Sequence, residues 1–105
     1  MSGAHARKCY RPRMLAHCGA TSVHAIAAVV ARRVRRLWRS HQEAVMVLML
    51  DGADCYAIPM SHPYARSWGD DPRNLIGVYA RDGCDHETLR ARVLDDLAEH
   101  VALAS

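Results

Sequence analysis

The chain has 105 residues, enough for one domain with its own core, and its 50% hydrophobic and 24% charged residues are typical of a globular protein. The longest uninterrupted apolar run, residues 44–50, is too short to cross a bilayer, and the polar, basic start lacks a signal-peptide pattern. The net charge of +3 allows an anionic partner without requiring one. We therefore expect a cytoplasmic protein, without membrane attachment, whose four cysteines stay reduced.

The first 19 residues show no clear hydrophobic period, and Pro12 interrupts them. They carry four cations, which are Arg7, Lys8, Arg11 and Arg13. We predict a basic N-terminal arm over residues 1–19, followed by a single α+β domain over residues 20–105.

Residues 22–39 have the period of an amphipathic helix, for which Thr21 or Ser22 can supply the N-cap oxygen. The apolar face consists of Val23, Ile26, Ala27, Val30, Val34, Leu37 and Trp38. The opposite face carries Arg32, Arg35, Arg36 and Arg39. The pattern predicts a helix with one face in the core and a row of guanidinium groups turned toward water.

Three segments follow that have the length and composition of strands. Residues 44–50 are apolar at every position, and an Asp-Gly turn at 51–52 joins them to a second strand at 55–60. Pro59 cannot donate to a sheet ladder, so the second strand should end there, lie at an edge or bulge. We expect a third strand at residues 74–80.

A second amphipathic helix is expected over residues 85–103, and Asp85 can cap it. The order of elements predicts an α+β fold, a two-layer sandwich of about three antiparallel strands with both helices on one sheet face. The other face would then expose part of residues 44–50. Since a second copy of the chain would cover that face, we expect a homodimer.

The arginine face has three interpretations. The simplest is a solvated face whose charge is balanced by carboxylates of the second helix, with Asp95, Asp96 and Glu99 as the candidates. A row of guanidinium groups can also follow a phosphate backbone, so nucleic acid is allowed, although the sequence does not favour it. The third interpretation is a surface that binds an acidic protein. The candidate binding residues on this face are Arg32, Arg35, Arg36 and Arg39.

The connection at residues 61–73 is turn-rich and carries side chains typical of binding sites: aromatic rings, an imidazole, carboxylates and guanidinium groups. Its candidate binding residues are Tyr64, Arg66, Trp68 and Arg73. In an enzyme, His62 would be the general base, and Arg66 or Arg73 would stabilise negative charge. The alternative is a structural connection in which Trp68 fills part of the core.

The cysteines and histidines show no metal-ligand spacing. Their densest cluster is Cys9, His17, Cys18 and His24, and it lacks the close ligand pair that grips a zinc ion from one turn. No glycine-rich phosphate loop occurs either. We expect neither a metal nor another cofactor.

Residues 57–63 (Ala-Ile-Pro-Met-Ser-His-Pro), after an apolar strand and a turn, resemble the strand-and-loop segment of MazF/PemK-type ribonuclease toxins. The resemblance covers roughly twenty residues. It implies a small SH3-like barrel that cleaves RNA. Where those toxins have barrel strands, this chain has the amphipathic helix of residues 22–39.

The sequence therefore predicts a small non-enzymatic binding or interaction protein that self-associates. Small size and the lack of a recognisable motif are typical of accessory proteins of mobile elements or phages. The alternative function is a nucleic-acid-binding or ribonuclease toxin-like protein that uses the arginine face and the connection at residues 61–73.

Overall fold

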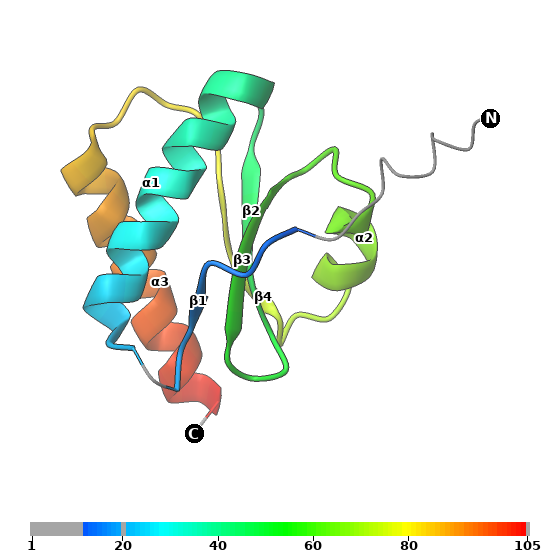
Figure 1. Cartoon of the computed structure of the whole chain (residues 1–105), viewed down its shortest axis with the longest axis vertical. Helices are drawn as coiled ribbons and strands as arrows, with labels where there is room; N and C mark the ends of the chain where they lie inside the picture. Colours follow the sequence, from blue (N-terminus) through cyan, green and yellow to red (C-terminus); the bar gives the residue numbers. More distant parts are fainter. Residues whose placement is uncertain (1–11, 20, 105) are drawn as a thin grey trace.

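The computed structural model describes residues 12–19 and 21–104, and its fold is α+β. Helices α1 (Val23–His41) and α3 (His86–Ala104) lie side by side on one face of an antiparallel sheet, and the short helix α2 (Tyr64–Gly69) lies on the other (Figure 1). The strands are β1 (Ala16–His17), β2 (Val45–Leu50), β3 (Asp54–Pro59) and β4 (Leu75–Tyr79). The fold class and the shared face of the two long helices are confirmed, with four strands rather than about three.

The sheet is open, with the strand order β1-β3-β2-β4. β2 and β3 form a hairpin whose turn residues Asp51 and Gly52 both have positive φ, the backbone geometry that favours an Asp-Gly pair. β3 ends at Pro59, as its missing amide hydrogen predicts. In the described residues, this open sheet differs from the barrel that the resemblance to ribonuclease toxins implies.

Helix α1 begins and ends at residues suited to those positions. The Ser22 hydroxyl accepts a hydrogen bond from the amide of Ala25, and Gln42 closes the helix in the left-handed conformation. The buried stripe of α1 packs against that of α3, where Leu89, Val93 and Leu97 are fully buried. The arginine face of α1 is thereby turned away from the core.

Strand β2 is buried on both faces within a single chain. Val45, Val47 and Met49 belong to the core beneath α1 and α3, whereas Met46 and Leu48 belong to the cluster beneath α2. The expectation that the second sheet face is exposed is therefore wrong, because α2 covers it. An exposed sheet face therefore no longer supports the expected homodimer, which stays a prediction.

Two elements were not predicted from the sequence. One is α2, which lies within the segment expected to be a turn-rich connection. The other is β1, a two-residue strand within the expected arm that pairs with β3. Residues 1–11 of the expected arm lie outside the described residues. Over the described ranges, no helix is long and apolar enough to cross a membrane.

Candidate functional site

Seven of the eleven arginines in the described residues lie around one side of α1. We call them the basic surface; they are Arg13, Arg32, Arg33, Arg35, Arg36, Arg39 and Arg81. Five come from α1, one precedes β1 and one follows β4. The fold therefore joins the predicted arginine face to cations from two other segments.

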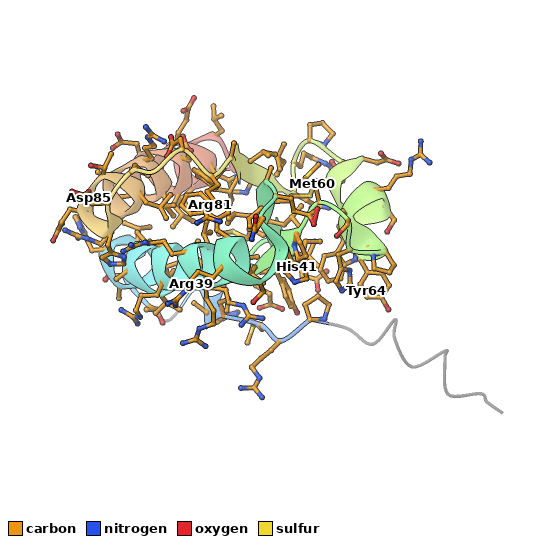
Figure 2. All side chains as sticks on the ribbon, turned by 90° about the horizontal axis from the view of Figure 1, so that it is seen from above. Arg39, His41, Met60, Tyr64, Arg81 and Asp85 are labelled. Carbon is orange, nitrogen blue, oxygen red and sulfur yellow. The ribbon has the colours of Figure 1, made fainter. Side chains whose placement is uncertain are left out.

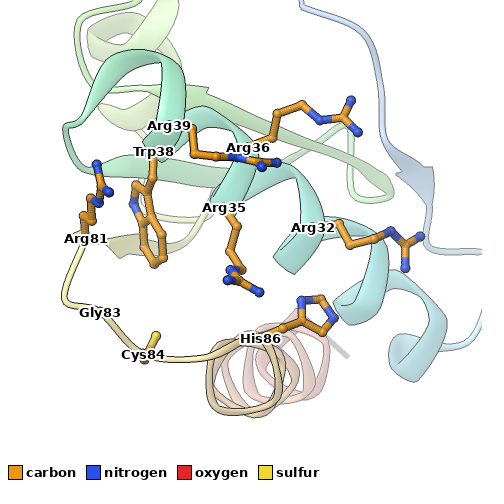
Figure 3. Close-up of a pocket in the computed structure, with 9 residues that line it drawn as sticks. All are labelled: Arg32, Arg35, Arg36, Trp38, Arg39, Arg81, Gly83, Cys84 and His86. Carbon is orange, nitrogen blue, oxygen red and sulfur yellow. The ribbon is translucent and has the colours of Figure 1, made fainter.

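A groove runs between α1 and the segment that leads into α3, and we call it the loop groove. Its volume is about 410 Å³. Arg35 extends across it toward Cys84 and His86, while Arg36 extends away from that segment (Figure 3). Arg81, which follows the end of β4, lines the same groove. The cationic groups of the loop groove therefore come both from α1 and from the segment that leads into α3.

A second groove runs along the other side of α1, and we call it the arm groove. Its volume is about 710 Å³. Pro12, Arg13 and Leu15 form one wall, and the opposite wall of α1 contributes Val29 and Arg33. Arg32 and Arg36 line both grooves. The basic surface is therefore continuous across α1.

Trp38 connects the loop groove to the core. Its indole ring lines the groove, and its Nε1–H donates a 3.0 Å hydrogen bond to the main-chain oxygen of Tyr79. The hydroxyl of Tyr79 in turn donates a 2.6 Å hydrogen bond to Asp96 on α3. Burial and the neighbouring carboxylate raise the pKa of Tyr79 well above its usual range, so the phenol stays protonated. This chain of contacts fixes α1, β4 and α3 relative to one another.

Among the residues that the structure describes, no carboxylate lines either groove. Asp82 bonds to Arg92 at 2.7 Å and accepts from the amide of Cys84, and these bonds hold the pKa of its carboxyl well below the usual range. Asp85 accepts from the amide of Thr88 at 2.8 Å, which caps α3 and lowers the pKa of Asp85, with a smaller contribution from the charge of Arg35. Neither carboxylate of this segment forms a hydrogen bond or ion pair with an arginine of the basic surface, although the charges of Asp85 and Arg35 interact.

In the described residues, none of the carboxylates expected to balance the arginine face forms a hydrogen bond or ion pair with it. Asp96 binds Tyr79, and Asp95 lines a different hollow beside β4. Across residues 12–19 and 21–104, guanidinium groups pair with carboxylates at Arg73–Asp71, Arg90–Glu87 and Arg92–Asp82, and the imidazole of His17 contacts the carboxylate of Asp54. No member of the basic surface belongs to one of these pairs. The solvated-face interpretation therefore lacks the neutralising contacts that it assumed.

Helix α2, which carries Tyr64, Arg66 and Trp68, lies on the opposite side of the sheet from α1, as the positions of Tyr64 and Arg39 show (Figure 2). Tyr64 and Trp68 of α2 pack on the second sheet face, with ring centroids 5.0 Å apart, and Trp68 lies 5.2 Å from Tyr56. Arg66 is exposed on the same helix. Arg73 is held by Asp71 through three hydrogen bonds, from its amide, Nε and a terminal nitrogen. These residues form no continuation of either groove.

His62 has a structural contact. Its Nδ1 accepts a 3.0 Å hydrogen bond from the amide of Tyr64 at the start of α2. Partial burial and the charge of His41 lower the pKa of the imidazole, so the neutral form is favoured. Among the described residues, no hydrogen bond or ion pair joins His62 to Arg66 or Arg73. The three candidate catalytic groups are not connected to one another.

The described cysteines, Cys18, Cys55 and Cys84, are free thiols. Burial is the main cause that raises the pKa of Cys55 to about 12. No group of three or more potential metal ligands forms over the ranges that the structure describes. Cys9, part of the densest cysteine and histidine cluster, lies outside them.

The sequence predicted the four exposed arginines of α1 as candidate binding residues but not the other three arginines of the basic surface. Arg13 and Arg81 are distant from α1 in the chain, and only the β1–β3 pairing and the end of β4 bring them to it. Arg33 is half-buried and lies at the flank of the face. Comparison of the chain with protein-family models, curated proteins and solved structures finds no match.

Proposed function

We propose that this protein is a non-enzymatic nucleic-acid-binding protein that uses the basic surface. The supporting observation is that seven arginines adjoin two grooves without a carboxylate lining either groove. Unpaired guanidinium groups bind phosphate bidentately, and each neutralised phosphate releases counterions from the nucleic acid. Four exposed arginines of α1 line the loop groove, and their spacings of three and four residues place neighbouring Cβ atoms about 5–6 Å apart on one helix face.

The groove linings favour nucleic acid over an acidic protein. Stable protein interfaces centre on buried apolar or aromatic anchors. Trp38, the indole that lines the loop groove, is only 5% exposed and offers little area for such an anchor. The groups that project from α1 are guanidinium groups, which suit a phosphate backbone.

The other candidate residues support a role without catalysis. The neutral imidazole of His62 stabilises the start of α2, and Arg73 is engaged by Asp71. A general base and its charge-stabilising partner would have to converge on one reacting atom. These groups are instead committed to separate local contacts.

Fluorescence anisotropy with labelled duplex and single-stranded oligonucleotides tests the proposal. We expect binding at low salt whose logarithmic affinity falls linearly with the logarithm of salt concentration. Arg32→Ala/Arg36→Ala, which removes the two arginines that line both grooves, should weaken binding by about tenfold or more. Arg66→Ala/Arg73→Ala removes the same charge from the other side of the sheet and should leave the affinity nearly unchanged.

Three results would contradict this function. They are an absence of binding to every oligonucleotide at low salt, an affinity independent of salt, and tighter binding of poly-glutamate than of any nucleic acid. The last result would favour an acidic protein partner. Degradation of labelled RNA that is lost in His62→Asn would instead favour the ribonuclease alternative.

A further inference from the structure

We infer that the nucleic acid is duplex DNA, that α1 enters its major groove, and that each groove beside α1 receives one sugar-phosphate backbone. This inference rests on the proposed function and specifies the form of its ligand. It comes from the position of the two grooves, which lie on opposite sides of a single helix and share Arg32 and Arg36. The exposed face of α1 therefore forms a ridge between two hollows, and this ridge is part of the inference.

The dimensions of such a ridge match those of the DNA. An α-helix with its side chains is about 10–12 Å across, and the major groove of B-form DNA is about 12 Å wide. The stretch of α1 from Arg32 to Arg39 rises about 10 Å, since each residue advances the helix by about 1.5 Å. With α1 in the groove, the two DNA backbones would lie beside it, where the loop groove and the arm groove are.

The arginines divide into three groups across this ridge. Arg35, Arg39 and Arg81 lie in the loop groove alone, and Arg13 and Arg33 lie in the arm groove alone. Each of these two sets can contact one backbone. Arg32 and Arg36 lie between them and face the bases, where arginine binds the O6 and N7 atoms of guanine bidentately.

The segment that contains Arg13 and forms one wall of the arm groove is hydrogen-bonded to β3 and the turn before it. Arg13 therefore has a defined position. The amide of Leu15 donates to the main-chain oxygen of Cys55 at 2.8 Å, and the amide of Cys18 donates to that of Ala53 at 2.7 Å. The imidazole of His17 contacts the carboxylate of Asp54 at 2.8 Å. These contacts hold the segment alongside α1 before any ligand binds.

Other nucleic acids match this arrangement less well. A single strand has one backbone and would fill one groove, leaving the cations of the other without phosphates. Double-stranded RNA has two backbones, but its major groove is too deep and narrow for a helix. Of the three, only B-form DNA combines two backbones with a major groove wide enough for a helix.

The experiment compares a short duplex DNA with double-stranded RNA of the same sequence and with each DNA strand alone. We expect duplex DNA to bind about tenfold more tightly than the other two at equal salt. Arg35→Ala/Arg81→Ala and Arg13→Ala/Arg33→Ala should each reduce the log–log salt slope by roughly two, one unit for each lost phosphate contact. Methyl green, which occupies the major groove, should compete with the protein, whereas netropsin in the minor groove should not.

Circular dichroism and thermal unfolding check that each variant remains folded. Arg66→Ala/Arg73→Ala is the charge-matched control and should keep the wild-type slope. Equal or tighter binding of single strands or of RNA would overturn the inference while leaving the proposed function in place. The inference would also be overturned if only one of the two double variants, Arg35→Ala/Arg81→Ala or Arg13→Ala/Arg33→Ala, had a reduced salt slope. Competition by netropsin but not by methyl green would overturn it as well. If no nucleic acid binds, the proposed function fails together with this inference.

Discussion

The indole nitrogen of Trp38 donates its hydrogen bond to the main-chain oxygen of Tyr79, which lies 41 residues further along the chain. This bond joins α1 to the last strand inside the core. We expect Trp38→Phe to leave the oxygen unsatisfied and to lower the free energy of unfolding by about 1–3 kcal/mol. Urea unfolding followed by circular dichroism measures the change.

Tyr79→Phe is the comparison variant, because it keeps the main-chain oxygen and removes only the hydroxyl that bonds to Asp96. The two substitutions should each destabilise the protein through a different bond. A Trp38→Phe variant with the wild-type urea midpoint would show that the indole bond contributes nothing to stability.

Trp68 should matter for stability rather than for binding. Its ring packs on Tyr64 and Tyr56 over the second sheet face, so Trp68→Ala opens a cavity beneath α2. We expect a loss of about 2–4 kcal/mol in urea unfolding. The variant should also bind more of the dye ANS, because Met46 and Leu48 become accessible.

Arg66→Ala on the same helix is the control for that substitution, since this side chain is exposed and should change stability by less than about 0.5 kcal/mol. If both variants unfold at the same urea concentration, α2 does not stabilise the sheet. Light scattering on Trp68→Ala also shows whether uncovering this face causes self-association.

The sequence predicted the elements whose signals are local. The period of α1, the Asp-Gly turn and the ladder-breaking Pro59 each act within a few residues, and their positions are confirmed. The helix α2 has only six residues and a proline-rich surrounding, so its period was too short to recognise. Its role in covering the sheet depends on contacts with strands that no local pattern shows.

The site was predicted only in its helical part for a related reason. The face of α1 follows from helix geometry, whereas the proximity of Arg13 and Arg81 follows from the sheet topology. The sequence also could not predict that no carboxylate would form an ion pair with the basic surface in the described residues. This absence depends on Asp82 bonding to Arg92 and on Asp96 bonding to Tyr79, and neither contact has a sequence signature.

Acid should destabilise the protein through His62. The folded imidazole has a lowered pKa, so the unfolded chain binds more protons as the pH falls below the ordinary value of 6.5. The free energy of unfolding should therefore fall between neutral pH and the folded pKa. In the folded state, protonation removes the acceptor for the Tyr64 amide and adds repulsion from His41.

The variant His62→Asn keeps an oxygen acceptor near the position of Nδ1 and cannot be protonated. Its urea midpoint should depend less on pH across this window than that of the wild type. His24→Asn, on the exposed face of α1, is the matched control. A pH dependence that is identical in wild type and His62→Asn would exclude His62 as its source.

The Cys55 thiol should be unreactive in the native state. Burial raises its pKa to about 12, and thiolate is the reactive form. In a variant with Cys9, Cys18 and Cys84 changed to serine, we expect modification by Ellman's reagent to proceed at the rate of unfolding. A companion variant that retains only the half-buried Cys18 should react faster. Rapid modification of Cys55 in native conditions would contradict the core position of this residue.

None of the eleven acidic residues lines the grooves beside α1, although the chain as a whole carries a net charge of only +3. Much of the positive charge of the described residues is therefore concentrated around α1. In the field of a polyanion the molecule should rotate to present α1 before any contact forms, so a larger fraction of collisions is productive. Because the Debye length is about 8 Å at physiological ionic strength, this orientation acts only over the last few ångströms of approach.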